Sequence, residues 1–413
     1  MKEMKDTGTL FSGKQGQNYL FPFILITSLF FMWGFAHSLL DVLNKHFQES
    51  LQLTKAQSGA VQTAAYGAYF VMAIPAGIIA RKFGYKAGIL VGLVLFAAGA
   101  FWFVPAVSIN TFWAFLLGLL ILFCGLTCLE TVANPYTIVL GPPETAARRI
   151  NLAQTFNALG WICGPLIGSL LIFGSESGKS NAALIPPYVG LGILVLLVLV
   201  LFLLVKLPEI KAESDDPEAA ATTAAVSRPL IRQRHFVLAV VAQFLYVAAQ
   251  TGIGSFFINY TIEVEELHLT QVEAGLLLAL GGMSLFAIGR FAGSFIMKKI
   301  KAETLLGTFA LVNTLLMAVV ILYHNQLGVG ALILCYLFMS IMFPSIFALG
   351  VKGLGNQTKT ASSLLILTIV GGAIAPPLMG YIGAVSMNVG FIIPLVCFLY
   401  ISFFGYFGNK SAS

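Results

Sequence analysis

The chain has 413 residues, of which 58% are hydrophobic and only 10% are charged, and its mean hydropathy is +0.90. This composition indicates a polytopic membrane protein. The formal net charge of +6 does not indicate a nucleic-acid partner, because the basic residues flank hydrophobic segments, where they would face anionic lipid.

Runs of about 20 apolar residues, long enough to cross a hydrocarbon core, recur along the chain. The stretch "VGLGILVLLVLVLFLLV" (189–205) is apolar on every side, whereas barrel strands would alternate over about ten residues. We therefore predict an all-α membrane protein whose first span is retained, because no signal-peptide cleavage site follows it. Twelve spans are predicted, near 20–46, 56–81, 87–105, 111–140, 148–174, 185–206, 234–262, 270–297, 303–323, 328–351, 359–384 and 388–407.

The distribution of Lys and Arg predicts the orientation. With both termini in the cytoplasm, 19 of these residues fall in cytoplasmic segments, and the outer loops keep only three: Lys45, Lys55 and Lys179. The positive-inside rule therefore predicts a multi-pass protein with both termini cytoplasmic.

One long polar segment, "LPEIKAESDDPEAAATTAAVSRPLIRQ" (207–233), follows the sixth span. Its composition is typical of a linker without a packed core. It divides the chain into two predicted six-helix bundles, 1–206 and 234–413, joined by a cytoplasmic linker.

The two predicted bundles share a sequence repeat, which supports this division. A six-plus-six repeat is the plan of a major facilitator transporter, in which pseudo-two-fold symmetry relates the bundles and substrate binds between them. The matches are Leu53, Thr54, Gly59, Ala76, Gly77 and Lys82 with Leu269, Thr270, Gly275, Ala292, Gly293 and Lys298; Gly160, Pro165, Leu166 and Gly168 with Gly372, Pro377, Leu378 and Gly380; and Pro135, Leu140 and Gly141 with Pro344, Leu349 and Gly350.

Glycines spaced four residues apart form seams on two predicted helices. Gly160, Gly164 and Gly168 share one face of the fifth span, and Gly289 and Gly293 share one face of the eighth. Such seams let neighbouring backbones approach closely. Rocking of rigid bundles, with Gly164 in a gating or structural role, and static packing are both compatible with this spacing.

Only three charged residues fall well inside the spans: Asp41, Glu130 and Arg290. A carboxylate at a helix centre costs on the order of 2.5–3.5 kcal/mol, so function is the default explanation. A carboxyl group that is neutral while buried and ionised when water reaches it couples proton movement to conformation. We expect Glu130 to carry the proton and Asp41 to respond to substrate arrival or outer-gate closure. Arg290 is expected to be a structural or gating charge that pairs with helix-end carbonyls or extends toward the membrane interface, with a substrate role as the alternative.

Glu130 belongs to the motif "CLETVANPYTIVLG" (128–141), which predicts a polar pocket in the fourth span. Asn134 lies one turn from Glu130, and Pro135 removes a backbone donor, so the helix is expected to bend there. Asn157 in the fifth span lies at a comparable depth. The alternative is a kink whose polar groups satisfy one another.

Polar side chains form stripes on three further spans. Trp33, His37, Asp41 and Asn44 share one face of the first span, and similar stripes occur on the second and seventh. Amides and aromatic faces together suit a neutral polyhydroxylated ligand, although for any single residue interhelical hydrogen bonding is an equal alternative. The other stripes are Gln62, Tyr66 and Tyr69, and Gln243, Tyr246 and Gln250.

No cofactor or metal site is expected from the sequence. All five cysteines fall within spans, and no Cys/His cluster has metal-ligand spacing. The segment "FGSESGKS" (173–180) is similar to a phosphate-binding loop, but its glycines are too close and it is predicted to lie outside the cell. An enzyme is therefore not expected.

The chain resembles the fucose:proton symporter family of the major facilitator superfamily, which also holds glucose and galactose permeases. The most specific segments are "GAYFVMAIPAGIIARKFGYKAG" (67–88), "CLETVANPYTIVLGPPETAARRINLAQTFNALG" (128–160) and "GRFAGS" (289–294). The resemblance implies roles in proton coupling and substrate response for Asp41 and Glu130. It also implies polar helix 5 residues at Gln154 and Asn157.

What the resemblance implies is a proton-coupled monosaccharide symporter of the bacterial inner membrane, expected as a monomer that binds sugar, proton and lipid and no nucleic acid. Sodium coupling and efflux antiport are the alternatives within the superfamily. The chain departs from the superfamily signature at Arg81, which replaces an acid, so the usual charge relay of that loop does not carry over. Some glucose and galactose relatives lack the helix 4 glutamate, and Glu130 therefore favours the proton-coupled branch.

Overall fold

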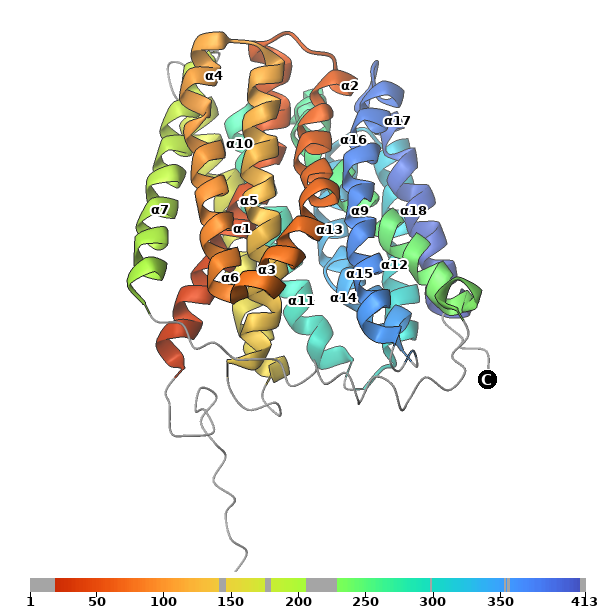
Figure 1. Ribbon diagram of the computed structural model, residues 1–413. Helices are drawn as coiled ribbons and strands as arrows, with labels where there is room; N and C mark the ends of the chain where they lie inside the picture. Colours follow the sequence, from red (N-terminus) through yellow and green to blue (C-terminus); the bar gives the residue numbers. More distant parts are fainter. Residues whose placement is uncertain are drawn as a thin grey trace, which may run out of the picture.

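The structure is a computed structural model that describes residues 19–140, 146–174, 180–205, 229–297, 299–352, 354 and 357–408. Every secondary-structure element in these ranges is helical (Figure 1). Within these ranges, twelve helical spans are long and apolar enough to cross a membrane, as predicted. Their limits lie close to the expected ones because lipid-spanning length, rather than side-chain detail, defines them.

Of the first six spans, two are single helices and four combine two elements. They are α1 (Leu20–Ser50); α2 (Lys55–Ser58) with the first part of α3 (Ala60–Phe101); the rest of α3 with α4 (Phe103–Ile109); α5 (Phe112–Val139); α6 (Ala146–Gly168) with the π-helix η2 (Ser169–Phe173); and the 3₁₀ helix η3 (Asn181–Leu184) with α7 (Ile185–Leu204).

The second six spans follow the same plan, with the short helices η4 (Leu230–Arg232) and η5 (Glu265–Leu267) on either side of the first. They are α9 (Arg234–Ile262); α10 (Gln271–Leu276) with η6 (Leu277–Met283) and α11 (Ser284–Ile296); α12 (Ala302–Leu322); α13 (Gln326–Met339) with α14 (Met342–Val351); α15 (Thr358–Leu367) with η8 (Thr368–Val370) and α16 (Gly371–Ile382); and α17 (Met387–Gly390) with α18 (Ile392–Phe403) and η9 (Phe404–Gly408).

A glycine marks the boundary between the second and third spans. Gly84 has φ 84° and ψ 171°, a conformation that side chains disfavour, and the chain reverses there within α3. The polar break expected over 82–86 is therefore a sharp kink at Gly84 that separates two helices within α3. The predicted linker 207–233 lies mainly outside the described residues.

Two matched helix starts show the sequence repeat in three dimensions. The Thr54 side chain accepts a hydrogen bond from the backbone N–H of Gln57, and the Gln57 side chain accepts one from the backbone N–H of Thr54. Thr270 and Glu273 make the same reciprocal pair at the start of α10. Each pair satisfies two backbone donors that a helix start leaves free.

The glycine seam of α6 packs on α1, as the spacing predicts. A Cβ atom at Gly160 would collide with the Phe31 carbonyl and lie 2.7 Å from the Phe35 amide nitrogen. At Gly164 it would meet the Ser38 side chain, and at Gly168 it would lie 2.6 Å from Leu39. The two helices therefore approach with almost no side chain between them.

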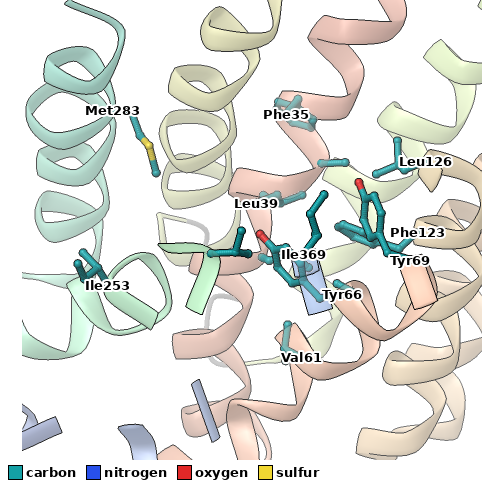
Figure 2. Packing of buried hydrophobic residues seen from close by; sticks show 14 of the residues in the cluster. Phe35, Leu39, Val61, Tyr66, Tyr69, Phe123, Leu126, Ile253, Met283 and Ile369 are labelled. Atoms are coloured by element: carbon teal, nitrogen blue, oxygen red, sulfur yellow. The ribbon is translucent and has the colours of Figure 1, made fainter. Parts of the chain in front are cut away.

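The two groups of spans meet along α1 with α9, α3 with α16, and α6 with η6. Most of the first-half helices lie on the left of Figure 1 and most of the second-half helices on the right. Figure 2 shows side chains of both groups at this meeting zone, among them Tyr66 from α3, Ile253 from α9 and Met283 from η6. The interface between halves thus holds both apolar and polar side chains.

The α1–α6 contact gives the first prediction. Gly160→Ala places a methyl group against the α1 backbone, and we expect a loss of about 1–3 kcal/mol in stability, measured by thermal unfolding in detergent. Gly190→Ala is the matched control, because no heavy atom lies within 4 Å of its Cβ position. Equal melting temperatures for the two variants would contradict the packing described here.

Candidate functional site

A narrow cavity lies between the two groups of spans and is lined by residues of both. Its walls combine a carboxyl group, amides and aromatic rings, the mixture expected of a polar-ligand site. The first group contributes His37, Asp41, Gln62, Tyr66 and Trp161, and the second contributes Gln250, Thr251, Gly254, Met283 and Tyr336.

Asp41 on α1 is the buried charge of this cavity, with 4% of its surface exposed. Its Oδ1 atom accepts a hydrogen bond from Gln62 Nε2 at 3.2 Å. Gly254 of α9 faces its other oxygen, and a Cβ atom at that position would lie 2.8 Å from Oδ2. Asp41 is therefore held by α3 and sits directly against the second half.

His37 lies one turn before Asp41 and is enclosed by aromatic rings. Its centroid is 4.8 Å from that of Phe123 and 5.9 Å from that of Trp161, which stacks on it. His37 Nε2 lies 2.8 Å from the Tyr69 hydroxyl oxygen. Tyr69 and Phe123 lie together in Figure 2, close to Leu126 of α5.

Glu130 lies on α5, behind this aromatic group, and is half-buried. Its carboxyl group interacts with the Tyr69 hydroxyl. Glu130 is therefore connected to the cavity through Tyr69 and His37 rather than lining it.

Four other predicted binding residues are not among those that line the cavity. The Trp33 ring packs 5.9 Å from the His37 ring, measured between centroids. The Asn44 amide donates to the Ser255 carbonyl of α9, and the Asn157 amide donates to the Phe30 carbonyl at 3.0 Å. In this conformation both amides join helices, the alternative that the sequence left open. Gln154 is half-buried on α6.

The side chains of Asn134 and Pro135 lie outside the described part of the structure, so the bend at Pro135 stays a prediction. Arg290 donates from Nε to the carbonyl of Ser340, the C-cap of α13, at 3.3 Å. Its guanidinium carbon lies 4.8 Å above the Phe286 ring. This is the helix-end pairing expected of it.

Sequence reasoning missed five residues that line the cavity: Trp161, Thr251, Gly254, Met283 and Tyr336. Two of them had a usable signal, because Trp161 adjoins Gly160 of the glycine seam and Thr251 follows Gln250 of a polar stripe. Met283 ends the π-helix η6, a wider turn typical of functional positions. The side chains of Met283 and Tyr336 are common in membrane helices and carried no pattern.

Polar contacts close the end of the bundle that holds Ser50, Lys55, Ile262 and Met387, here called the far end. Lys55 Nζ lies 2.6 Å from Glu263 Oε1 and donates to the Gly383 carbonyl at 2.9 Å. Glu263 Oε2 accepts from the Met387 amide at 2.8 Å. These contacts join α2 of the first half to three helices of the second, near the top of Figure 1.

Two amide contacts extend this closure. Asn259 Nδ2 donates to Gln48 Oε1 at 2.6 Å, and Gln271 donates to Glu49. The halves also touch through their backbones, since a Cβ atom at Gly59 would lie 2.8 Å from the Pro376 carbonyl carbon. The far end is thus tightly packed between halves.

Within the described residues, no group of three or more His, Cys, Asp or Glu side chains could hold a metal ion. The five cysteines are free thiols, and they are buried or half-buried.

Comparisons with known proteins define the class. The family model described as Major Facilitator Superfamily matches residues 24–376. The E. coli K12 protein named L-fucose-proton symporter is 39% identical, over 97% of this chain and 95% of its own length. The chain therefore belongs to the Major Facilitator Superfamily, and within it to the fucose:proton symporter family of sugar permeases.

Other relatives and structures agree with this assignment. A Brucella abortus protein named Glucose/galactose transporter is 36% identical over 96% of each chain. The crystal structure of FucP in the outward conformation matches with a TM-score of 0.68 and 37% identity, covering 95% of this chain and all of that one. The inward-facing bacterial Spinster homologue matches with a TM-score of 0.77 at 14% identity, which supports the fold.

Proposed function

We propose that this protein carries a monosaccharide together with a proton into the cell by alternating access. One observation carries the proposal: the cavity between the halves brings the carboxyl group of Asp41 together with polar side chains from both halves. The carboxyl group of Glu130 is connected to this cavity through the hydrogen-bonding side chains of Tyr69 and His37. A ligand bound there would touch both halves, so its arrival can bias their arrangement.

The lining suits a sugar. Gln62, Gln250 and Thr251 offer donors and acceptors for hydroxyl groups, while Tyr66 and Trp161 offer ring faces for the C–H side of a pyranose. Relatives named for L-fucose, glucose and galactose support a hexose or deoxyhexose as cargo. The cavity is narrow because this conformation is closed at the far end.

The orientation of the molecule completes the proposal. With both termini cytoplasmic in the bacterial inner membrane, the far end faces outward, so this conformation is closed toward the outside. Halves 1–206 and 234–413 would rock about the central cavity, with the close α1–α6 packing keeping the first half rigid. Sugar enters when the far-end contacts separate.

Replacement of Glu130 tests the coupling. In reconstituted vesicles, Glu130→Gln should keep exchange of labelled sugar between two pools but lose accumulation driven by a pH gradient, because a glutamine cannot carry the proton. Glu265→Gln, at an exposed acidic residue of η5, is the matched control and should accumulate sugar like the parent.

Accumulation by Glu130→Gln at the parent level would remove Glu130 from the mechanism. Accumulation by the parent driven by a sodium gradient and indifferent to pH would replace the proton with sodium. Net sugar export driven by inward proton flow would indicate efflux antiport.

The far-end closure gives a separate prediction. Spin labels at Ser108 and Gln326, exposed positions on opposite halves at that end, report its opening as a longer distance between labels. Lys55→Glu or Glu263→Lys alone places like charges together and should lengthen the distance.

The double reversal restores the ion pair and should recover part of the short distance, although the bonds to Gly383 and Met387 stay lost. Identical distances in the parent and both single variants would show that the pair does not hold this end closed.

A further inference from the structure

His37 sits at the boundary between the sugar cavity and the environment of Glu130. Its ring lines the cavity, and its Nε2 atom contacts the Tyr69 hydroxyl at 2.8 Å. The same hydroxyl interacts with the Glu130 carboxyl group. A continuous line of hydrogen-bonding atoms therefore runs from the cavity to Glu130, across three helices.

The surrounding rings fix the orientation of His37. The centroids of the Tyr66, Phe123 and Trp161 rings lie 5.6, 4.8 and 5.9 Å from its own. These rings come from α3, α5 and α6, so the imidazole is packed on several sides. The contact between Nε2 and Tyr69 is thus maintained by packing as well as by the bond itself.

The other ring nitrogen has no protein partner. His37 Nδ1 is buried without a hydrogen bond, and the residue is 5% exposed. An unsatisfied buried polar atom costs about 1–3 kcal/mol, so a partner from outside the protein is favoured there. A sugar hydroxyl or a water molecule in the cavity would provide it.

We propose that His37 and Tyr69 form a hydrogen-bond relay that delivers a proton from the cavity to Glu130. The same relay makes the affinity of the cavity for sugar depend on whether Glu130 is protonated. The proposal rests on the function proposed above. In this proposal, His37 and Tyr69 link sugar binding to proton binding. Neither side chain holds the transported proton before or after the transfer.

During the transfer, His37 and Tyr69 each accept one proton and release one, so both residues are neutral before and after it. With Glu130 ionised, the Tyr69 hydroxyl donates to the carboxylate and accepts from Nε2–H of neutral His37, which leaves Nδ1 as an acceptor. A proton taken up at Nδ1 from the cavity releases the Nε2 proton to the Tyr69 oxygen, and the Tyr69 proton passes to Glu130. One proton enters, and Glu130 becomes neutral.

The relay reverses the hydrogen-bonding role of the His37 Nδ1 atom that faces the sugar. Before the transfer, Nδ1 accepts a hydrogen bond from a sugar hydroxyl; afterwards Nδ1 carries the proton and donates. A ligand oriented for one state is mismatched to the other, so sugar affinity depends on the protonation of Glu130. Return of Tyr69 and His37 to their first arrangement accompanies proton release on the other side of the membrane.

The other groups around His37 define what else could titrate. Asp41 lies on the same helix, Tyr66 and Tyr69 come from α3, and Tyr336 lies across the cavity on α13. The α5 neighbours are Phe123 and, beyond Tyr69, Glu130. Trp161 of α6, Met283 of η6 and Gln250, Thr251 and Gly254 of α9 carry no titratable group.

Tyr69→Phe tests the relay, because it removes the hydroxyl and keeps the ring that packs against His37. In reconstituted vesicles we expect this variant to keep sugar exchange at equal pH and to lose accumulation driven by a pH gradient. In binding measurements on purified protein, its sugar affinity should lose the pH dependence shown by the parent.

Two further variants separate this role from simple packing. His37→Gln can still contact a sugar and Tyr69 but cannot shift a proton between two ring nitrogens, so it should behave like Tyr69→Phe. Tyr188→Phe, at a buried tyrosine stacked on Phe103 away from the cavity, is the control and should match the parent.

The outcomes distinguish the relay from the wider proposal. A parent that couples sugar to protons and a Tyr69→Phe variant that couples equally well would overturn the relay and leave the transport function standing. Equal loss of exchange and accumulation in Tyr69→Phe would also overturn it, since that pattern marks a packing defect. A parent without proton coupling would refute the proposed function itself.

Discussion

The structure depends on the cost of keeping two carboxyl groups inside an apolar bundle. Each such group costs on the order of 2.5–3.5 kcal/mol at the centre of a span. For Asp41 the Gln62 amide reduces this cost, and for Glu130 the Tyr69 hydroxyl does. The most polar part of the interior therefore surrounds these two residues, between helices that belong to different halves.

The remaining architecture keeps this polar region in a defined place. The glycine seam lets α6 pack against the α1 backbone, so the helix that carries His37 and Asp41 is fixed within the first half. Across the interface, the halves are joined at the far end by side-chain bonds and one ion pair, together with a close backbone approach at Gly59. Such bonds can be exchanged for water when that end opens, at a far smaller cost than separating α1 from α6. Rigid halves and a breakable contact between them are what alternating access requires.

The two carboxyl groups occupy different positions relative to the cavity. Asp41 faces the second half at Gly254. Glu130 does not line the cavity and is connected to it through Tyr69 and His37. In the proposed mechanism, proton binding at Glu130 and sugar binding in the cavity occur at separate places. The hydrogen bonds of Tyr69 and His37 connect these two places.

The sequence predicts much of this arrangement, and the limits of that prediction have physical reasons. The twelve spans follow from hydrophobic length, and the matched capping pairs at Thr54 and Thr270 follow from the repeat. His37, Asp41, Gln62, Tyr66 and Gln250 line the cavity, and the sequence singles them out because polar groups within a span are costly enough to be conspicuous.

Other residues could not be assigned from sequence alone. An amide that reads a ligand and an amide that joins two helices look the same in a sequence, and in this conformation Asn44 and Asn157 do the second. Tyr336 and Met283 are hidden among side chains that packing alone would explain in a chain with 13 tyrosines and 11 methionines. Their place in the site follows from how the two halves come together, which no local pattern records.

The central claim is that sugar and proton cross the membrane together. The most direct measurement adds L-fucose, D-glucose or D-galactose to a lightly buffered suspension of sealed vesicles that contain the protein, with no ion gradient imposed. The external pH should rise as the transported sugar enters, and a protonophore should abolish that rise. Sugar entry at an unchanged external pH would contradict the account.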